Sequence, residues 1–406
     1  MKFISTKRVV KNEVRSLKDE LRSLKEEITK SENERQNTLV EFSKKSDVNL
    51  NQLDVKLSQL KESIANNKTD ATKEFANLKC NFANLENKYE DIKNLLKKDD
   101  YPYLVFPQWV DHFNHTIKSL NIESSYKKLI KNLDEESIDK ISKIVARALY
   151  LFNKRPEEVR DFLSSEEKIK IRDNRNSLFE HILHFGPNCH CFNGYFLPVN
   201  NFEESTFIEN YGLDCISQDY LIDKDVIDAG AYVGDSSLVF ERHLKSINKI
   251  YAFEPVFYSE LKETVSMNES KKIIPINYAL SDKKAHVELK GLGMGASISF
   301  NNDTLGLESV ASSEAVPLDE FVSTNNLNVG LIKTDVEGHE MPLLKGALET
   351  IKKQKPTLII SIYHSAQDFF GIKSFIEDLN LGYKFKIFKA NDGYVLTGTL
   401  LICEQR

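Results

Sequence analysis

The chain has 406 residues, and at roughly 150 residues per domain this length predicts two or three structural units and excludes a single small module. Hydrophobic residues make up 41% and charged residues 29% of the sequence, which excludes disorder throughout and indicates a normal core with an added polar helical segment. A formal net charge of -6 provides no overall positive field, so we expect no nucleic-acid partner.

Residues 1–100 carry the hydrophobic spacing of a coiled coil. Apolar side chains such as Val10, Val14 and Leu17 recur four and three residues apart between charged positions, and Pro102 ends the pattern. A helix of about 90 residues would be on the order of 135 Å long, so its apolar stripe must meet another chain or fold back. We therefore predict an oligomerising stalk and a homo-oligomer, with a solvated charged helix as the alternative.

The sequence also predicts a cytoplasmic location. No apolar leader opens the chain, and no apolar run approaches about 18 residues, so we expect no transmembrane segment. The five cysteines are odd in number and include no Cys-x-x-Cys pair, which fits a reducing compartment. Peripheral recruitment to a membrane-bound assembly stays open.

Residues 101–194 are predicted to form a small helical linker or subdomain, with helices at 137–151 and 157–162. The segment 192–198 predicts a turn and a short strand. Five potential zinc ligands crowd into eleven residues: His181, His184, Cys189, His190 and Cys191. One residue separates the two cysteines instead of two to four, and no distant pair completes a site, so we expect no metal here.

From Asp223 onward, short apolar runs alternate with amphipathic helical stretches. The runs are Val226–Asp228, Ile250–Phe253, Ile273–Ile276, Val329–Ile332 and Leu358–Ile362. This alternation predicts an α/β fold with a parallel sheet. Ligands of such sheets bind at the carboxyl ends of the strands, so chemistry is expected just after each run.

A glycine turn follows the first apolar run, in the sequence Asp228-Ala-Gly230-Ala-Tyr-Val-Gly234. It lets a ligand approach the backbone before a helix begins, and it differs from the G-x-G-x-x-G pyrophosphate motif. Glu254-Pro255 follows the second run, where an acidic residue can accept both hydroxyls of a ribose. Together they predict an adenosine-type nucleoside, although each alone is compatible with an ordinary turn or a solvated carboxylate.

Two apparent strands close the chain, Tyr383–Phe388 and Tyr394–Cys403, joined through Asn391-Asp-Gly393. So short a connection predicts an antiparallel pair. An otherwise parallel sheet that ends in a hairpin resembles the class I S-adenosylmethionine-dependent methyltransferases, whose seven-stranded sheet closes with an antiparallel strand.

Five further segments narrow this resemblance. They are residues 276–282, 291–297, 316–321, 332–340 and 356–364. In this order they resemble the motifs of the FkbM methyltransferase family, over residues 195–406. The resemblance implies a class I methyltransferase-like seven-stranded mixed sheet with its last strand antiparallel, and S-adenosylmethionine as the cofactor.

The resemblance also implies which residues bind S-adenosylmethionine. In the glycine motif these are Asp228, Gly230, Ala231, Tyr232, Gly234, Asp235 and Ser236, followed by Glu254 and Pro255 after the second strand, and by Asn277, Ala279 and Asp282 beside the adenine. Family members of known activity methylate a hydroxyl oxygen, commonly of a sugar or natural product. Ser361 stands where the family more often has an acidic residue, and His339 where it usually has a small one.

Methyl transfer from a sulfonium requires an acceptor held in line and a base for the hydroxyl proton. Asp335, after the fourth apolar run, is the first candidate for that base or for orienting the acceptor, followed by Glu337 and His364. Asp335, Glu337 and Glu340 could instead hold a divalent cation, but helix N-termini favour acids in any case, so we expect no metal. His364 could equally be a hydrogen-bonded histidine at the edge of the core.

The leading hypothesis is an S-adenosylmethionine-dependent O-methyltransferase that acts on a hydroxyl of a sugar or surface glycan precursor. One alternative is a catalytically inactive, methyltransferase-like scaffold in which the coiled coil carries the function. Another is a nicotinamide-dependent oxidoreductase, which the missing G-x-G-x-x-G and the closing hairpin disfavour.

Overall fold

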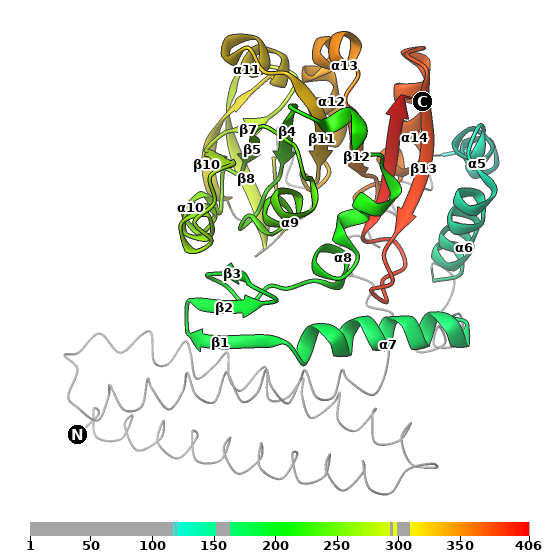
Figure 1. Ribbon diagram of the computed structural model, residues 1–406. Coiled ribbons are helices and arrows are strands. Elements are labelled where there is room, and N and C mark those ends of the chain that lie inside the picture. The colour runs from blue at the N-terminus through cyan, green and yellow to red at the C-terminus, as the bar shows by residue number, and fades with distance from the viewer. Residues whose placement is uncertain (1–116, 118–119, 152–162, 293–294, 299–308, 406) are drawn as a thin grey trace, which may run out of the picture. The chain divides into compact units, whose positions relative to one another are not determined.

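The computed structural model describes residues 117, 120–151, 163–292, 295–298 and 309–405 (Figure 1). The predicted coiled coil at 1–100 and the predicted helix at 157–162 lie outside the described residues. None of the described helices is both long enough and apolar enough to cross a bilayer.

A seven-stranded sheet forms the centre of the fold, with the strand order β13-β14-β12-β11-β4-β5-β6. Its strands are β4 (Asp225–Ala229), β5 (Ile250–Phe253), β6 (Ile273–Ile276), β11 (Val329–Thr334), β12 (Thr357–Ser361), β13 (Tyr383–Lys389) and β14 (Thr399–Gln405). All pairings are parallel except those of β14, which runs antiparallel to β12 and β13. This confirms the predicted methyltransferase-like fold, including its antiparallel last strand.

Helices cover both faces of this sheet (Figure 1). One face packs against α8 (Glu204–Phe207), α9 (Asp235–His243) and α10 (Tyr258–Met267). The other packs against α5 (Ile122–Ile130), α6 (Glu135–Leu151), α11 (Leu318–Asn325), α12 (Glu340–Gly346), α13 (Leu348–Gln354) and α14 (Ala366–Asp378). Successive residues of a strand therefore pack into the two different cores, as Val226 and Ile227 do. Because both faces of such a strand are buried, its sequence is a continuous apolar run. Each such side chain contributes roughly 1.5–3 kcal/mol by its burial.

Two smaller sheets were not predicted from the sequence, although one of their strands lies within the segment 192–198, where a short strand was expected. Strands β1 (Ile182–Gly186), β2 (Cys189–Phe192) and β3 (Tyr195–Leu197) form an antiparallel sheet after α7 (Ser165–Phe179). Strands β7 (Ala279–Leu280), β8 (Ala285–Leu292), β9 (Gly295–Ile298) and β10 (Ser309–Val316) form a sheet of order β7-β10-β8-β9. Of the histidines considered as zinc ligands, His181 follows α7 closely, while His184 and His190 face each other across β1 and β2 with their Nδ1 atoms 2.8 Å apart.

The closing hairpin differs in detail from its prediction. Strands β13 and β14 do pair in antiparallel fashion, with Lys389 opposite Thr399, so the connection spans residues 390–398. The prediction that Tyr394 begins the last strand is wrong. The Asp392 carboxylate accepts a hydrogen bond from the Tyr394 backbone N–H and pairs with Lys389, and these contacts hold a wider loop beside the site described below.

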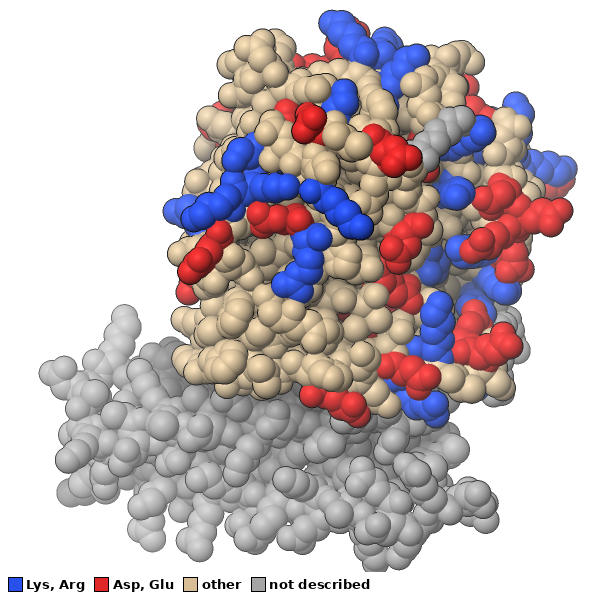
Figure 2. All heavy atoms as spheres, in the orientation of Figure 1, with Lys and Arg blue, Asp and Glu red and all other residues tan. Residues whose placement is uncertain are grey.

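Charged side chains of both signs lie interspersed over the face drawn in Figure 2. Several form pairs within one helix, such as Glu136 with Lys140 and Asp139 with Lys143 in α6. Such exposed pairs contribute little to stability, because water and salt screen them.

Candidate active site

The loops that follow β4, β5, β11 and β12 meet at the carboxyl edge of the sheet. The turn after β4 has positive φ angles at Gly230 (72°), Tyr232 (46°) and Gly234 (92°). A Cβ on Gly230 would lie 1.8 Å from the backbone oxygen of Asp335, so only glycine fits there. The predicted cofactor turn is therefore in backbone contact with the predicted catalytic segment.

The buried side chain of Asp228 holds this turn in place. Its carboxylate is fully buried, and its Oδ2 accepts hydrogen bonds from the hydroxyls of Ser236 (2.7 Å) and Ser237 (2.6 Å) in α9. Its Oδ1 lies 3.0 Å from the Nζ of Lys333, which also donates to the Gly230 carbonyl at 2.7 Å. With both oxygens engaged, Asp228 shapes the cofactor turn through these contacts.

Lys333 in β11 is the buried cation that links the two parts of the site. Burial by itself lowers the pKa of Lys333, but the carboxylates of Asp228, Asp335 and Asp235 outweigh it and raise that pKa above its ordinary value. Lys333 therefore stays charged between the glycine turn and Asp335. Sequence reasoning overlooked it, although a lysine inside an apolar strand is a signal of a buried ion pair.

Glu254, at the end of β5, closes the other side of the turn. Its Oε2 accepts the Tyr232 backbone N–H (3.0 Å), and its Oε1 accepts those of Val256 (2.7 Å) and Phe257 (3.1 Å). Burial raises the pKa of Glu254, against the lowering effect of these three N–H groups. The carboxylate thus joins two loops and has little remaining capacity for ligand hydroxyls.

The predicted adenine segment follows β6. Asn277 and Asp282 are exposed, whereas Ala279 is buried in β7 opposite Ala315 of β10. Next to it, the Ser281 hydroxyl contacts the Nε2 of His339 at 3.0 Å. This contact ties the segment to the loop after β11. Burial lowers the pKa of His339, which favours its neutral form.

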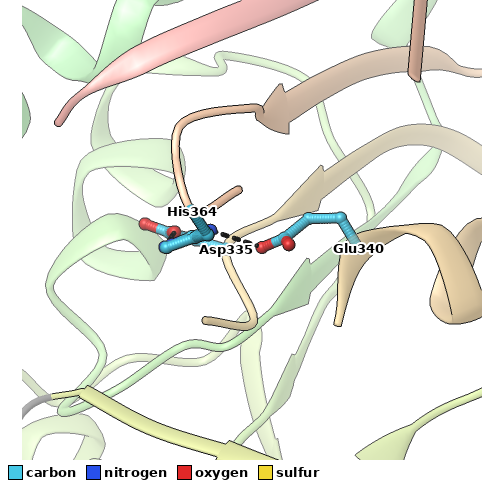
Figure 3. Close-up of side chains that lie close together, drawn as sticks. All are labelled: Asp335, Glu340 and His364. Carbon is cyan, nitrogen blue, oxygen red and sulfur yellow. Dashed lines mark ion pairs between the residues drawn. The ribbon is translucent and has the colours of Figure 1, made fainter. Parts of the chain in front are cut away.

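Four ionisable side chains converge where β11 and β12 end. Figure 3 shows His364 between Asp335 and Glu340, with its Nδ1 2.9 Å from Glu340 Oε1 and its Nε2 3.4 Å from Asp335 Oδ1. Glu337 Oε2 lies 3.6 Å from the same Nε2. The structure thus brings all three predicted catalytic side chains together.

The charged side chains of this cluster shift one another's pKa values. Burial lowers the pKa of His364, but Glu340, Glu337 and Asp335 more than compensate and raise it to about 10, so they hold a proton on the imidazole. Burial raises the pKa of Glu337 to about 8, against the opposing effect of His364. Glu340 is fully buried, and its Oε1 also accepts the Val336 backbone N–H at 2.9 Å.

Two tyrosines that were not predicted hold Asp335 in place. Tyr211 donates to its Oδ2 at 2.9 Å and Tyr363 to its Oδ1 at 3.2 Å. Both are buried, and both line a hollow of about 90 Å³ beside Asp335. Carboxylates and aromatic rings dominate its described lining, which includes Glu203, Tyr211, Asp335, Tyr363, Asp392 and Tyr394. Tyr211 lies far from the strand-end motifs in sequence, so motif reasoning could not find it.

The fold and this edge define a methyltransferase-like α/β domain, with a glycine turn after the first strand, an acid after the second and a carboxylate after the fourth. Residues 228–385 match the family model described as the Methyltransferase FkbM domain. This part of the chain is therefore similar to FkbM methyltransferases.

One solved structure that matches this chain is the methyltransferase FkbM from Methylobacillus flagellatus KT. It shares 17% sequence identity with this chain at a TM-score of 0.47, and the alignment covers 73% of this chain. The chain spans 62% of the length of that protein. None of the curated proteins matches this chain.

Proposed function

We propose that this protein is an S-adenosylmethionine-dependent O-methyltransferase that methylates a hydroxyl group of a sugar or surface glycan precursor. The observation that carries the proposal is the backbone contact between Gly230 and Asp335, inside the region that matches the FkbM domain. It joins a turn suited to a nucleoside with a carboxylate suited to an acceptor.

The chemistry follows from the residues of this edge. S-adenosylmethionine supplies a methyl group on a sulfonium, whose C–S bond breaks as the acceptor oxygen forms its new bond to carbon. Asp335 orients the acceptor hydroxyl and accepts its proton, while Tyr211 and Tyr363 fix the carboxylate by their hydrogen bonds. The products are a methyl ether and S-adenosylhomocysteine, and one proton is released.

The hollow beside Asp335 supports a polyhydroxylated acceptor. The carboxyl groups of Glu203 and Asp392 offer oxygen atoms that accept hydrogen bonds from hydroxyl groups, and the ring of Tyr394 offers a surface for the C–H face of a sugar. Sugars and glycan fragments are therefore the first acceptors to assay. The same lining residues also suit a small natural product with several hydroxyl groups.

Substitution of Glu254 or Asp228 by Ala tests the assigned cofactor pocket. Each is expected to weaken S-adenosylmethionine binding at least about tenfold, because each removes contacts that shape the turn around Tyr232 and Gly230. Asp225→Ala is the matched control: this buried carboxylate binds Asn248 and Asn328 at the opposite end of β4. Asp225→Ala should lower the stability of the protein but leave its affinity for S-adenosylmethionine unchanged. Unchanged cofactor affinity in the Glu254 and Asp228 variants would contradict the assigned pocket.

We further propose that residues 1–100 assemble the protein into a homo-oligomer, on the basis of their heptad spacing. Deletion of residues 1–97 should then lower the oligomeric state in sedimentation and leave cofactor binding intact. A truncated protein with unchanged assembly would contradict this role.

A cytoplasmic location completes the proposal, with peripheral recruitment to a membrane-bound assembly as one route to a surface glycan precursor. The described cysteines, Cys189, Cys191, Cys215 and Cys403, are free thiols, which fits a reducing compartment. A reporter fusion or fractionation of cells that express the protein would test this placement.

A further inference from the structure

The cluster around His364 has a geometry that its role in proton transfer does not require. One ligand atom from each of Asp335, Glu340 and His364 lies within 4.8 Å of the others, and Glu337 adds a fourth side chain. Asp335 and Glu337 lie in the loop between β11 and α12, Glu340 begins α12, and the imidazole comes from the loop after β12. The segments that follow two adjacent strands thus supply both oxygen and nitrogen donors to one cluster.

The distances on the two sides of the imidazole differ in length. The 2.9 Å between His364 Nδ1 and Glu340 Oε1 is a hydrogen-bond distance. The Nε2 lies 3.4 Å from Asp335 Oδ1 and 3.6 Å from Glu337 Oε2, which is longer than a normal hydrogen bond. Two atoms bound to one tetrahedral metal ion at about 2.1 Å are separated by about 3.4 Å, so the Nε2 side has the spacing of metal ligands.

A carboxylate oxygen on the Nε2 side supports the same conclusion. The Oε2 of Glu337 is a buried atom that receives no hydrogen bond from the described residues. Buried polar atoms without partners are rare because they forfeit the hydration of the unfolded state, and a cation would satisfy them.

We propose that Asp335, Glu337 and the Nε2 of His364 bind one divalent first-row transition metal ion, with Glu340 orienting the imidazole through its Nδ1–H. A carboxylate that holds the second nitrogen of a ligating histidine is a common feature of metal sites. The mixed nitrogen and oxygen donors suit Mn²⁺ or Zn²⁺, whereas Mg²⁺ and Ca²⁺ favour oxygen donors alone. Binding displaces the proton held on the imidazole.

The ion's role rests on the proposed function, although its binding does not. Asp335 lines the hollow proposed for the acceptor, so an acceptor hydroxyl can bind the ion as a further ligand. The ion lowers the pKa of that hydroxyl, whose proton passes to water, and the resulting oxygen is the nucleophile for the methyl group. Asp335 then holds the metal and no longer accepts the proton.

The test is a calorimetric titration of chelator-treated, full-length protein with MnCl2 and separately with ZnCl2. We expect one ion to bind per chain at micromolar concentration. Glu337→Gln should weaken binding at least about tenfold and His364→Asn at least about a hundredfold, because each removes a ligand. The matched control is His286→Asn, in which an exposed histidine 3.0 Å from Glu314 is lost and metal affinity should stay at the wild-type value.

Two results would overturn the inference: no binding of either ion at millimolar concentration, or wild-type affinity in both ligand variants. If His364→Asn does not fold, Glu337→Gln decides alone, since that side chain is 23% exposed and its substitution leaves no buried gap. S-adenosylmethionine affinity is measured in the same samples. If the wild-type protein binds S-adenosylmethionine but neither metal ion, this inference alone fails, and if it binds a metal ion but not S-adenosylmethionine, the proposed function alone fails.

Discussion

Replacement of Gly230 by Ala tests whether the cofactor turn and the catalytic loop form one unit. The φ angle of 72° costs a side-chain-bearing residue roughly 1–2 kcal/mol. The new Cβ would lie 1.8 Å from the Asp335 carbonyl oxygen and 2.8 Å from its carbon, so the two loops must separate by more than about 1 Å. Overpacking of this kind costs about 1–3 kcal/mol, which gives a total loss of about 2–5 kcal/mol.

Urea unfolding measures this loss, and calorimetry measures the accompanying fall in S-adenosylmethionine affinity. Gly371→Ala is the matched control, because Gly371 lies within α14 and a Cβ there would meet nothing within 4 Å. It should stabilise the protein by about 0.5–1 kcal/mol and leave affinity unchanged. If Gly230→Ala loses less than about 1 kcal/mol and binds the cofactor normally, the proposed contact between the two loops is refuted.

Two further substitutions test the buried charges. Lys333→Met leaves the carboxylate of Asp228 buried and unpaired, so we expect a loss of about 3–5 kcal/mol in urea unfolding; a loss below about 1 kcal/mol would show that the ion pair does not hold the turn. Burial raises the pKa of Asp235 from 3.8 to about 6, although Lys333 and the Ser236 N–H oppose it. Its ionised form therefore destabilises the fold: the penalty is absent below about pH 4, grows as the pH rises and is complete above about pH 6. Asp235→Asn should then stabilise the protein by up to about 3 kcal/mol at pH 7 and by nothing at pH 3.5, and a gain that does not depend on pH would contradict this explanation.

The parallel strands could be predicted from the sequence because both of their faces are buried. Runs such as Val226–Asp228 and Ile250–Phe253 are apolar at every position that enters a core, so period and length identify them without knowledge of the partner strand. The residue after each run must then lie at the carboxyl edge. This is why Asp335, Glu337 and His364 were expected at this edge, where the structure brings them together.

The remaining elements depend on contacts between residues distant in sequence. Tyr211 donates to Asp335 across 124 residues, and no local pattern marks it. The turn at Asn391-Asp-Gly393 is widened because Asp392 holds Lys389 and Tyr394, which turn propensity alone does not anticipate. Strand β8 could have been predicted from the sequence, because polar and apolar residues alternate from His286 to Lys290.

The candidate metal ligands could likewise be predicted only where they are close together in sequence. The sequence places Asp335, Glu337 and Glu340 close together, but helix N-terminal preference explains acids in that position equally well. His364 comes from another loop, and its position between these carboxylates is visible only in the fold. That position changes the expectation from no metal to a site with mixed donors.

Calorimetric titration of the full-length protein with S-adenosylmethionine, S-adenosylhomocysteine and NADH tests the central claim most directly. The glycine turn, Glu254 and the FkbM domain predict micromolar binding of the sulfonium and of its product, and no binding of NADH. Binding of NADH alone, or of none of the three, would contradict a methyltransferase that uses this pocket.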